Sequence, residues 1–329
     1  MMPPPIITTL RSDTDYSFRM LAGPTPPPYH DAMPEQADNL AAAYAHCQNL
    51  ANSHYENFPT ASKFIRRDLR PAVAAIYAFA RYADDLADEG DADAAQRLKQ
   101  LDAWETLLER CQNEAVDHPV FLALADAIRR HALPVQPLHD LLTAFRMDVS
   151  VHAYASVAEL MFYCQHSANP VGRLVLALHG IGHPSALAAS DAICSSLQLI
   201  NFWQDLSIDI PRGRCYLADE WLKSAKLDSR KVLSGQVSEA ELQVALGPAI
   251  DHTRQLMRSG RSLLAYLPWR LRLQIALTMR GGTRILDSVA ASRQVLRYRP
   301  ALSGGAWPGL IMLAFWDSMI TRQASMETA

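Results

Sequence analysis

The sequence predicts an all-α fold built as one large multi-helix domain. Apolar residues recur at a spacing of three to four over almost all of residues 41–300, which is the period of a helix with a buried face. Convincing alternating runs flanked by hairpin turns are absent, so we expect no strands. No repeat of 20–50 residues is apparent, which disfavours a solenoid.

The helical pattern is clearest in five segments, and two later segments are apolar on more than one side. These segments are residues 39–55, 71–89, 94–112, 118–133 and 135–154, followed by 172–182 and 192–203. Pro119 and Pro137 lie near predicted helix starts, while Gly180, Gly182 and Pro184 separate the two later segments. Helices that are apolar on several sides lie inside a bundle, so we expect a central apolar cavity.

The two ends of the chain differ from this domain. Residues 1–40 are rich in proline and lack periodicity, which is typical of a flexible leader. Residues 301–329 are predicted to form a C-terminal helix or tail. Its apolar stretch 307–320 has two interpretations, a last core or interface helix and a surface helix resting on lipid; the absence of a basic face favours the first.

Composition excludes several classes of protein. The chain has 329 residues, of which 49% are hydrophobic, and its net charge of −3 argues against a nucleic-acid partner. Five scattered cysteines without a CxxC pair fit reduced thiols. Neither a signal peptide nor an apolar run long enough to span a membrane is present. The expected location is the cytoplasm, with peripheral contact at the inner membrane face left open.

Two stretches place oxygen ligands on one side of a helix. The two sets are Asp84, Asp85 and Asp88, and Asn201, Asp205 and Asp209. Within each set the spacing is three to four residues, so the side chains stack on one helix face. Acids at this spacing are also common on solvated helix faces. Here, however, both sets follow strongly apolar sequence, where unpaired like charges are costly.

A divalent cation would remove this electrostatic cost. Carboxylate and amide oxygens are natural ligands of Mg²⁺, which completes its coordination with water and phosphate oxygens. Arg81 precedes the first set, and Arg212 and Arg214 follow the second. Arg81 has two interpretations, a salt bridge to the acids and a grip on phosphate oxygens. The chain has no P-loop and no dinucleotide-binding motif, so the pattern predicts a diphosphate held through Mg²⁺ beside an apolar cavity.

The segments around these motifs resemble the squalene/phytoene synthase family. The likeness covers residues 45–300 and is carried by 54–91, 163–176 and 196–217, within which both acidic motifs stand at the family spacing. In 56–62, 79–92 and 167–176 the sequence is most similar to the hydroxysqualene-forming members. The resemblance implies an isoprenoid-synthase-type fold and the conversion of presqualene diphosphate into hydroxysqualene. It also implies more than one Mg²⁺ ion, no NADPH and a paralogue that supplies the presqualene diphosphate.

The resemblance also implies roles for particular residues. Metal binding is expected of Asp84, Asp85, Asp88, Asn201, Asp205 and Asp209. Binding of the diphosphate or lining of the cavity is expected of His54, Tyr55, Asn57, Arg81 and Gln198, to which their position beside the second motif adds Gln204, Arg212 and Arg214. Catalysis is expected of Tyr163 together with Asp84, Asp88 and Asp205. Tyr163 has a second interpretation, a core tyrosine whose hydroxyl is satisfied.

Two positions depart from the family pattern. Gln204 stands where squalene and phytoene synthases usually have arginine, and Gly282 stands where they often have tyrosine. Loss of a cation beside the second motif suits an enzyme that binds one diphosphate. Two alternatives remain: a complete head-to-head condensing enzyme that acts on farnesyl or geranylgeranyl diphosphate, and a non-catalytic relative that binds partners or lipids. Retention of both acidic motifs disfavours the second.

Overall fold

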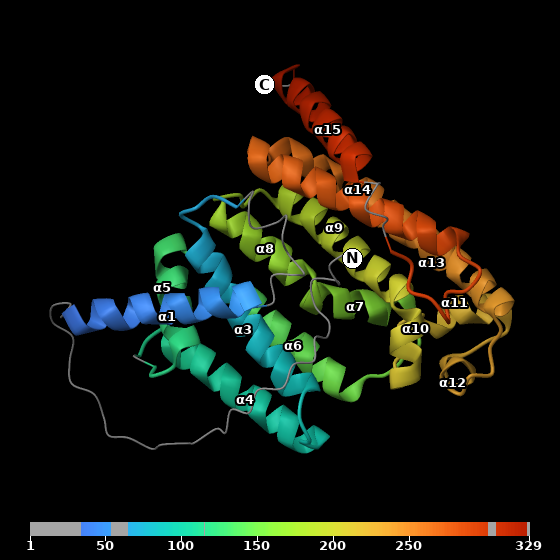
Figure 1. Ribbon diagram of the computed structural model, residues 1–329, viewed down its shortest axis with the longest axis horizontal. Helices are drawn as coiled ribbons and strands as arrows, with labels where there is room; N and C mark the ends of the chain where they lie inside the picture. Colours follow the sequence, from blue (N-terminus) through green and yellow to red (C-terminus); the bar gives the residue numbers. More distant parts are fainter. Residues whose placement is uncertain (1–33, 54–64, 115, 302–306, 328–329) are drawn as a thin grey trace.

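The computed structural model describes residues 34–53, 65–114, 116–301 and 307–327, and they form an all-α fold (Figure 1). Within these ranges no strand is present, and a single bridge joins Ala153 to Cys215. The α-helices are α1 (Pro34–Ser53), α3 (Arg70–Asp88), α4 (Ala94–Cys111), α5 (Pro119–His131), α6 (Gln136–Ser150), α7 (Val157–Ser167), α8 (Asn169–Leu178), α9 (Pro184–Gln204), α10 (Leu206–Asp209), α11 (Asp219–Leu222), α12 (Ser229–Leu233), α13 (Glu239–Ser259), α14 (Trp269–Ala291) and α15 (Trp307–Glu327). Short 3-10 segments are η2 (Ile210–Arg212), η3 (Lys223–Ala225) and η4 (Gly260–Tyr266). The prediction of an all-α protein is confirmed.

Most predicted helix boundaries agree with the structure. Pro119 is the first residue of α5, and Pro137 is the second residue of α6, where a missing N–H costs nothing. Gly180, with a φ of 70°, lies between α8 and α9, and Pro184 begins α9. The predicted leader 1–40 overlaps α1, which already begins at Pro34, and residues 1–33 lie outside the described part.

The prediction of a helix over 135–154 is wrong at its end. Helix α6 ends at Ser150, and Val151 is extended. The backbone beyond it bonds to a distant segment instead: Cys215 N donates to His152 O at 2.8 Å, and Asp219 N donates to Tyr154 O at 2.9 Å. Because these partners lie some 60 residues away, the local pattern could not reveal them.

Two apolar clusters form the core. One is built mainly from α1, α3, α4 and α5, with Phe79, Trp104 and Phe121 at its centre. The other is built mainly from α7, α9, α13 and α14 around Trp203, whose indole donates to Thr253 Oγ1 at 2.9 Å. Helices α6 and α8 contribute side chains to both clusters and so join the two halves.

Candidate active site

The first acidic set lies at the C-terminal end of α3. Small apolar residues and Phe79 bury one face of this helix, so its last turn is held against the core. Helix α3 ends at Asp88, and Gly90, with a φ of 77°, turns the chain away. Carboxylates at this end of a helix oppose the helix dipole, which favours cations there. Nearby positive charge therefore stabilises the last turn of α3.

Arg81 supplies part of that charge from within α3. Its guanidinium lies 2.5 Å from Asp85, 2.8 Å from Glu89 and 3.4 Å from Asp84. The Arg81 side chain is only 11% exposed, so these contacts are poorly screened by water. Of the two interpretations of Arg81, the structure shows the salt bridge; a grip on phosphate stays a prediction.

The second acidic set spans the junction between α9 and α10. Helix α9 ends at Gln204, and Asp205 departs from helical geometry. The ladder nevertheless continues, because Asp205 N donates to Asn201 O and Asp209 N donates to Asp205 O, each at 2.9 Å. Asp205 and Asp209 are both buried. The predicted stacking of Asn201, Asp205 and Asp209 is thus kept across two helices rather than along one.

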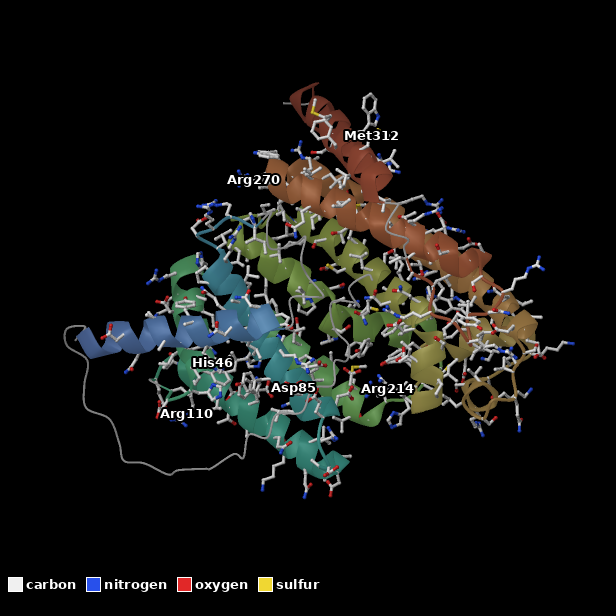
Figure 2. All side chains as sticks on the ribbon, in the orientation of Figure 1. His46, Asp85, Arg110, Arg214, Arg270 and Met312 are labelled. Carbon is white, nitrogen blue, oxygen red and sulfur yellow. The ribbon has the colours of Figure 1, made fainter. Side chains whose placement is uncertain are left out.

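Arg214 connects the two acidic sets. Gly213, with a φ of 79°, reverses the chain after η2, and Arg214 N donates to Asp209 O at 3.0 Å. The Arg214 guanidinium forms an ion pair with Asp88 of α3, including an Nη1 to Oδ2 contact of 3.4 Å. Two stretches more than 100 residues apart therefore meet through this pair, while the placement of both acidic sets around one metal site stays a prediction. Figure 2 shows Asp85 and Arg214 in the lower half of the view, away from α14 and α15.

Arg299 is a further cation at the site that sequence reasoning missed. It lies in the segment after α14 and forms an ion pair with Asp205, with a second contact of 3.4 Å from Nη2 to Oδ2. The neighbouring Gln204 is buried, and its amide donates to Pro300 O at 2.6 Å. Position 204 supplies no cation, as its glutamine implies, and Arg299 brings one to this motif from a distant segment.

Asp148 is a carboxylate of α6 that sequence reasoning also missed. It accepts a hydrogen bond of 3.1 Å from the Tyr163 hydroxyl. Burial raises the pKa of Asp148 to about 7; Arg214 lowers it, while Asp84 and Asp88 raise it further. Asp148 and Tyr163 therefore belong to the same electrostatic environment as the acidic end of α3. Asp148 has no acidic partner one helical turn away in the sequence, so no local signal marked it.

The pKa values of three further carboxylates of the site are also raised. Burial raises the pKa of Asp84 to about 7 and that of Asp85 to about 6, although Arg81 opposes both shifts. Burial and the nearby Asp205 raise the pKa of Asp209 to about 7. Three arginines do not fully compensate the carboxylates, which is the electrostatic setting that a hard cation relieves.

A buried aromatic cluster adjoins these carboxylates. It consists of Tyr154, Tyr163, Phe202 and Tyr216, and the rings of Phe202 and Tyr216 stack at a centroid distance of 3.7 Å. Tyr163 is buried with its hydroxyl satisfied by Asp148, as its core interpretation expects. Its hydrogen bond also places it beside the acidic site, so the two interpretations do not exclude each other.

Gly282 lies where α14 packs closely on α9. A Cβ at this position would approach Leu197 Cδ2 to 2.8 Å and Ile200 Cδ1 to 3.3 Å. A large side chain such as tyrosine therefore has no room here unless α9 shifts. This close packing gives a physical reason for glycine at this position.

The remaining predicted residues are placed as follows. Gln198 is buried on α9, one turn before Asn201. Arg212 ends η2, directly before the turn at Gly213. His54, Tyr55 and Asn57 lie outside the described residues.

The donor set fits a hard divalent cation in its chemistry. In the described part of the chain, no three histidine, cysteine or acidic side chains stand close enough together to hold an ion. The carboxylates are instead spread around Arg81, Arg214 and Arg299, each paired with at least one of them. All of the acidic ligands offer oxygen, and the pKa values of Asp84 and Asp209 are raised, first by burial and then by neighbouring carboxylates.

Comparison with known proteins gives a consistent result. The family described as squalene/phytoene synthase matches residues 51–306. The hydroxysqualene synthase of Rhodopseudomonas palustris is 36% identical and covers 70% of this chain and 78% of its own. The 15-cis-phytoene synthase of a Paracoccus strain is 30% identical and covers 80% of this chain and 87% of its own. The crystal structure of squalene synthase HpnC from Alicyclobacillus acidocaldarius superposes with a TM-score of 0.73 at 35% identity, over 79% of this chain and 97% of that one. With an all-α fold in which Arg214, after the second acidic segment, pairs with Asp88 of the first, and with a family match over most of its length, this chain belongs to the squalene/phytoene synthase family of enzymes.

Proposed function

We propose that this enzyme converts presqualene diphosphate into hydroxysqualene, in isoprenoid biosynthesis leading to hopanoids, with the help of Mg²⁺. The observation that carries the proposal is the placement of three arginines among carboxylates from both acidic segments, beside a buried aromatic cluster. Relatives at 33–36% identity bear the name hydroxysqualene synthase, which supports this substrate and product.

The reaction exchanges diphosphate for hydroxyl without oxidation or reduction. The C–O bond to diphosphate breaks, and its electron pair leaves with the diphosphate. The cyclopropylcarbinyl cation rearranges, a water oxygen bonds to the resulting cation, and that water loses one proton. Because no electrons enter from outside, the proposed reaction needs no NADPH.

Binding of the diphosphate is assigned to the arginines. Arg81, Arg214 and Arg299 now contact carboxylates, and guanidinium groups bind phosphate oxygens in the same bidentate manner. Mg²⁺, when bound, would neutralise these carboxylates and stabilise the leaving diphosphate. Its ligands would be Asp84, Asp85, Asp88, Asn201, Asp205 and Asp209.

Protection of the cation is assigned to the aromatic cluster. Tyr154, Tyr163, Phe202 and Tyr216 present π faces, which stabilise positive charge, and their burial excludes stray water. Asp148, whose pKa is about 7, is placed at the polar edge of this cluster and could hold the proton that the captured water releases.

The alternative is a complete condensing enzyme that makes squalene or phytoene from two isoprenoid diphosphates. Arg299 favours this alternative, because it gives the second motif the positive charge that Gln204 does not provide. The printed name of the HpnC structure, squalene synthase, points the same way.

Product analysis by mass spectrometry separates the two functions. Purified full-length protein with Mg²⁺ receives presqualene diphosphate in one reaction and farnesyl or geranylgeranyl diphosphate in the other, and the second is run with and without NADPH because squalene formation consumes a hydride. We expect hydroxysqualene from the first and no product from the second. A C30 or C40 hydrocarbon from the second reaction would establish the condensing enzyme. If Asp84→Ala and Asp205→Ala act like the wild type in whichever reaction succeeds, the assigned site is wrong.

A further inference from the structure

Helix α15 directs the Asp317 side chain, the only charged side chain that the structure describes in this helix, toward the rest of the protein. Leu310, Ala314 and Asp317 are buried and lie on one side of the helix at a spacing of three to four. Asp317 forms ion pairs of 2.7 Å with Arg261 of η4 and with Arg280 of α14. Arg272 also donates to Ser318 O at 3.5 Å. These contacts fix the rotation of α15 about its axis and so determine which side chains point outward.

The outward side of α15 is apolar. Together with two aromatic residues at the end of η4 and the start of α14 it forms a surface that we call the apolar face. It consists of Tyr266, Trp269, Ile311, Met312, Leu313, Phe315, Trp316 and Met319, each 39–68% exposed. These are eight of the eleven large hydrophobic residues exposed in the described part of the chain. Concentration of this kind marks an interaction surface rather than scattered exposure.

Arginines border the apolar face. Between Asp251 and Asp287 the chain has seven arginines and no acidic residue, although the whole chain carries a net charge of −3. Arg258, Arg261 and Arg270 of this segment are exposed, and the Arg270 guanidinium lies 5.3 Å from the centre of the Trp269 ring. Figure 2 shows Arg270 and Met312 on the same upper side of the molecule. These exposed arginines belong to α13, η4 and α14, the elements that precede α15 in the chain.

We propose that the apolar face and its bordering arginines bind the surface of a bilayer that contains anionic lipid. Tryptophan and tyrosine favour the boundary between headgroups and hydrocarbon, and arginines nearby are attracted by anionic headgroups. No helix in the described ranges is long and apolar enough to cross a membrane, so α15 lies along the bilayer surface. A two-fold dimer through this face is disfavoured, because it would set the same arginines against each other.

Vesicle flotation with the full-length chain tests this proposal without any substrate, so its outcome is independent of the proposed reaction. The probes are vesicles of phosphatidylcholine alone and vesicles that also contain phosphatidylglycerol. We expect the wild type to float with the mixed vesicles, and high salt to weaken this binding. Phe315→Ser/Trp316→Ser should reduce the partition coefficient on the order of tenfold or more, because two large apolar side chains no longer enter the lipid.

Three further variants make the result specific. Arg258→Gln/Arg270→Gln should weaken binding to the mixed vesicles by on the order of tenfold and leave binding to phosphatidylcholine unchanged. Phe162→Ser/Val244→Ser removes exposed hydrophobic residues of α7 and α13 and should bind like the wild type. Because substitutions in α15 could detach that helix, Trp269→Ser provides a test on α14, and circular dichroism checks that each variant folds.

Three outcomes would contradict lipid binding by the apolar face. If the wild type does not bind the mixed vesicles, or if the α15 and Trp269 variants bind them as well as the wild type does, the apolar face does not bind lipid. Analytical ultracentrifugation adds a third outcome. A wild-type dimer that Phe315→Ser/Trp316→Ser converts to a monomer, without vesicle binding by either, would identify the face as a contact between two copies and overturn the proposal.

Discussion

Arg214 and Asp88 form the ion pair that joins the two acidic segments. Asp88 ends α3, and Arg214 follows the turn after α10, so this contact ties the two halves of the molecule at the site. Both side chains are mostly buried. The pair therefore occupies the position at which we propose that diphosphate binds, and it connects the two acidic segments.

Replacing Arg214 should lower the stability of the folded protein and increase the stabilisation that Mg²⁺ provides. Arg214→Gln leaves Asp88 without its partner, and we expect the free energy of unfolding in EDTA to fall by about 1–3 kcal/mol. Mg²⁺ should raise the free energy of unfolding more in this variant than in the wild type, because the carboxylates that it binds have lost the positive charge of Arg214. Thermal unfolding with EDTA and with Mg²⁺ measures both effects. Arg110→Gln, which removes an exposed pair with Glu114, is the control and should change stability little.

The acidic site should make stability in EDTA depend on pH. The pKa values of Asp84, Asp148 and Asp209 are each raised to about 7, from about 4 in the unfolded chain. The folded state therefore binds more protons between these values, so stability falls as pH rises from about 4 to 7. Asp84→Asn should gain roughly 1 kcal/mol at pH 8 in EDTA, while product formation falls by about a hundredfold or more. An Asp84→Asn variant that is less stable than the wild type at pH 8 would contradict the repulsion that we infer.

Tyr163→Phe should affect catalysis more than packing. The change removes only the hydroxyl that donates to Asp148, and the ring stays in the aromatic cluster. We expect a loss of about 1–2 kcal/mol in stability and on the order of 10- to 100-fold in kcat. The control is Tyr154→Phe, which alters a neighbouring ring whose centroid lies 5.9 Å from that of Tyr163. Equal losses of kcat in both variants would show that Tyr163 has no special role.

The two adjacent glycines of α14 should respond differently to alanine. At Gly281 a Cβ meets nothing within 4 Å, so Gly281→Ala should gain about 0.5–1 kcal/mol from helix propensity. At Gly282 the same methyl group would crowd Leu197 and Ile200 of α9. We expect Gly282→Ala to be less stable than Gly281→Ala by about 1–2 kcal/mol in chemical denaturation. If the two variants are equally stable, α14 and α9 do not pack as closely here as the structure shows.

Sequence patterns correctly predicted the features that depend on residues close together in the chain. Helical periodicity predicted the fold class, and proline and glycine predicted the boundaries at α5, α6 and α9. The spacing within α3 likewise predicted that Asp84 and Asp88 share a helix face, because that geometry is set by one turn of helix.

The missed features all depend on contacts between distant segments. Asp148 reaches the site because α6 packs against α3 and α7, and Arg299 reaches it because the segment after α14 returns to the end of α9. Neither residue stands in a motif of its own. The basic border of α15 escaped notice for the same reason, since its arginines belong to η4, α13 and α14.

The inward turn of Asp317 has a consequence for how the chain can be shortened. Its carboxylate is shared by Arg261 and Arg280, so removal of α15 would leave both guanidinium groups without this partner. The same truncation would uncover the part of the second apolar cluster in which Ala314 is now fully buried. Helix α15 therefore acts as a structural cover of the second half of the molecule, and a shortened protein that ends before residue 307 should be soluble and stable only if that surface is redesigned.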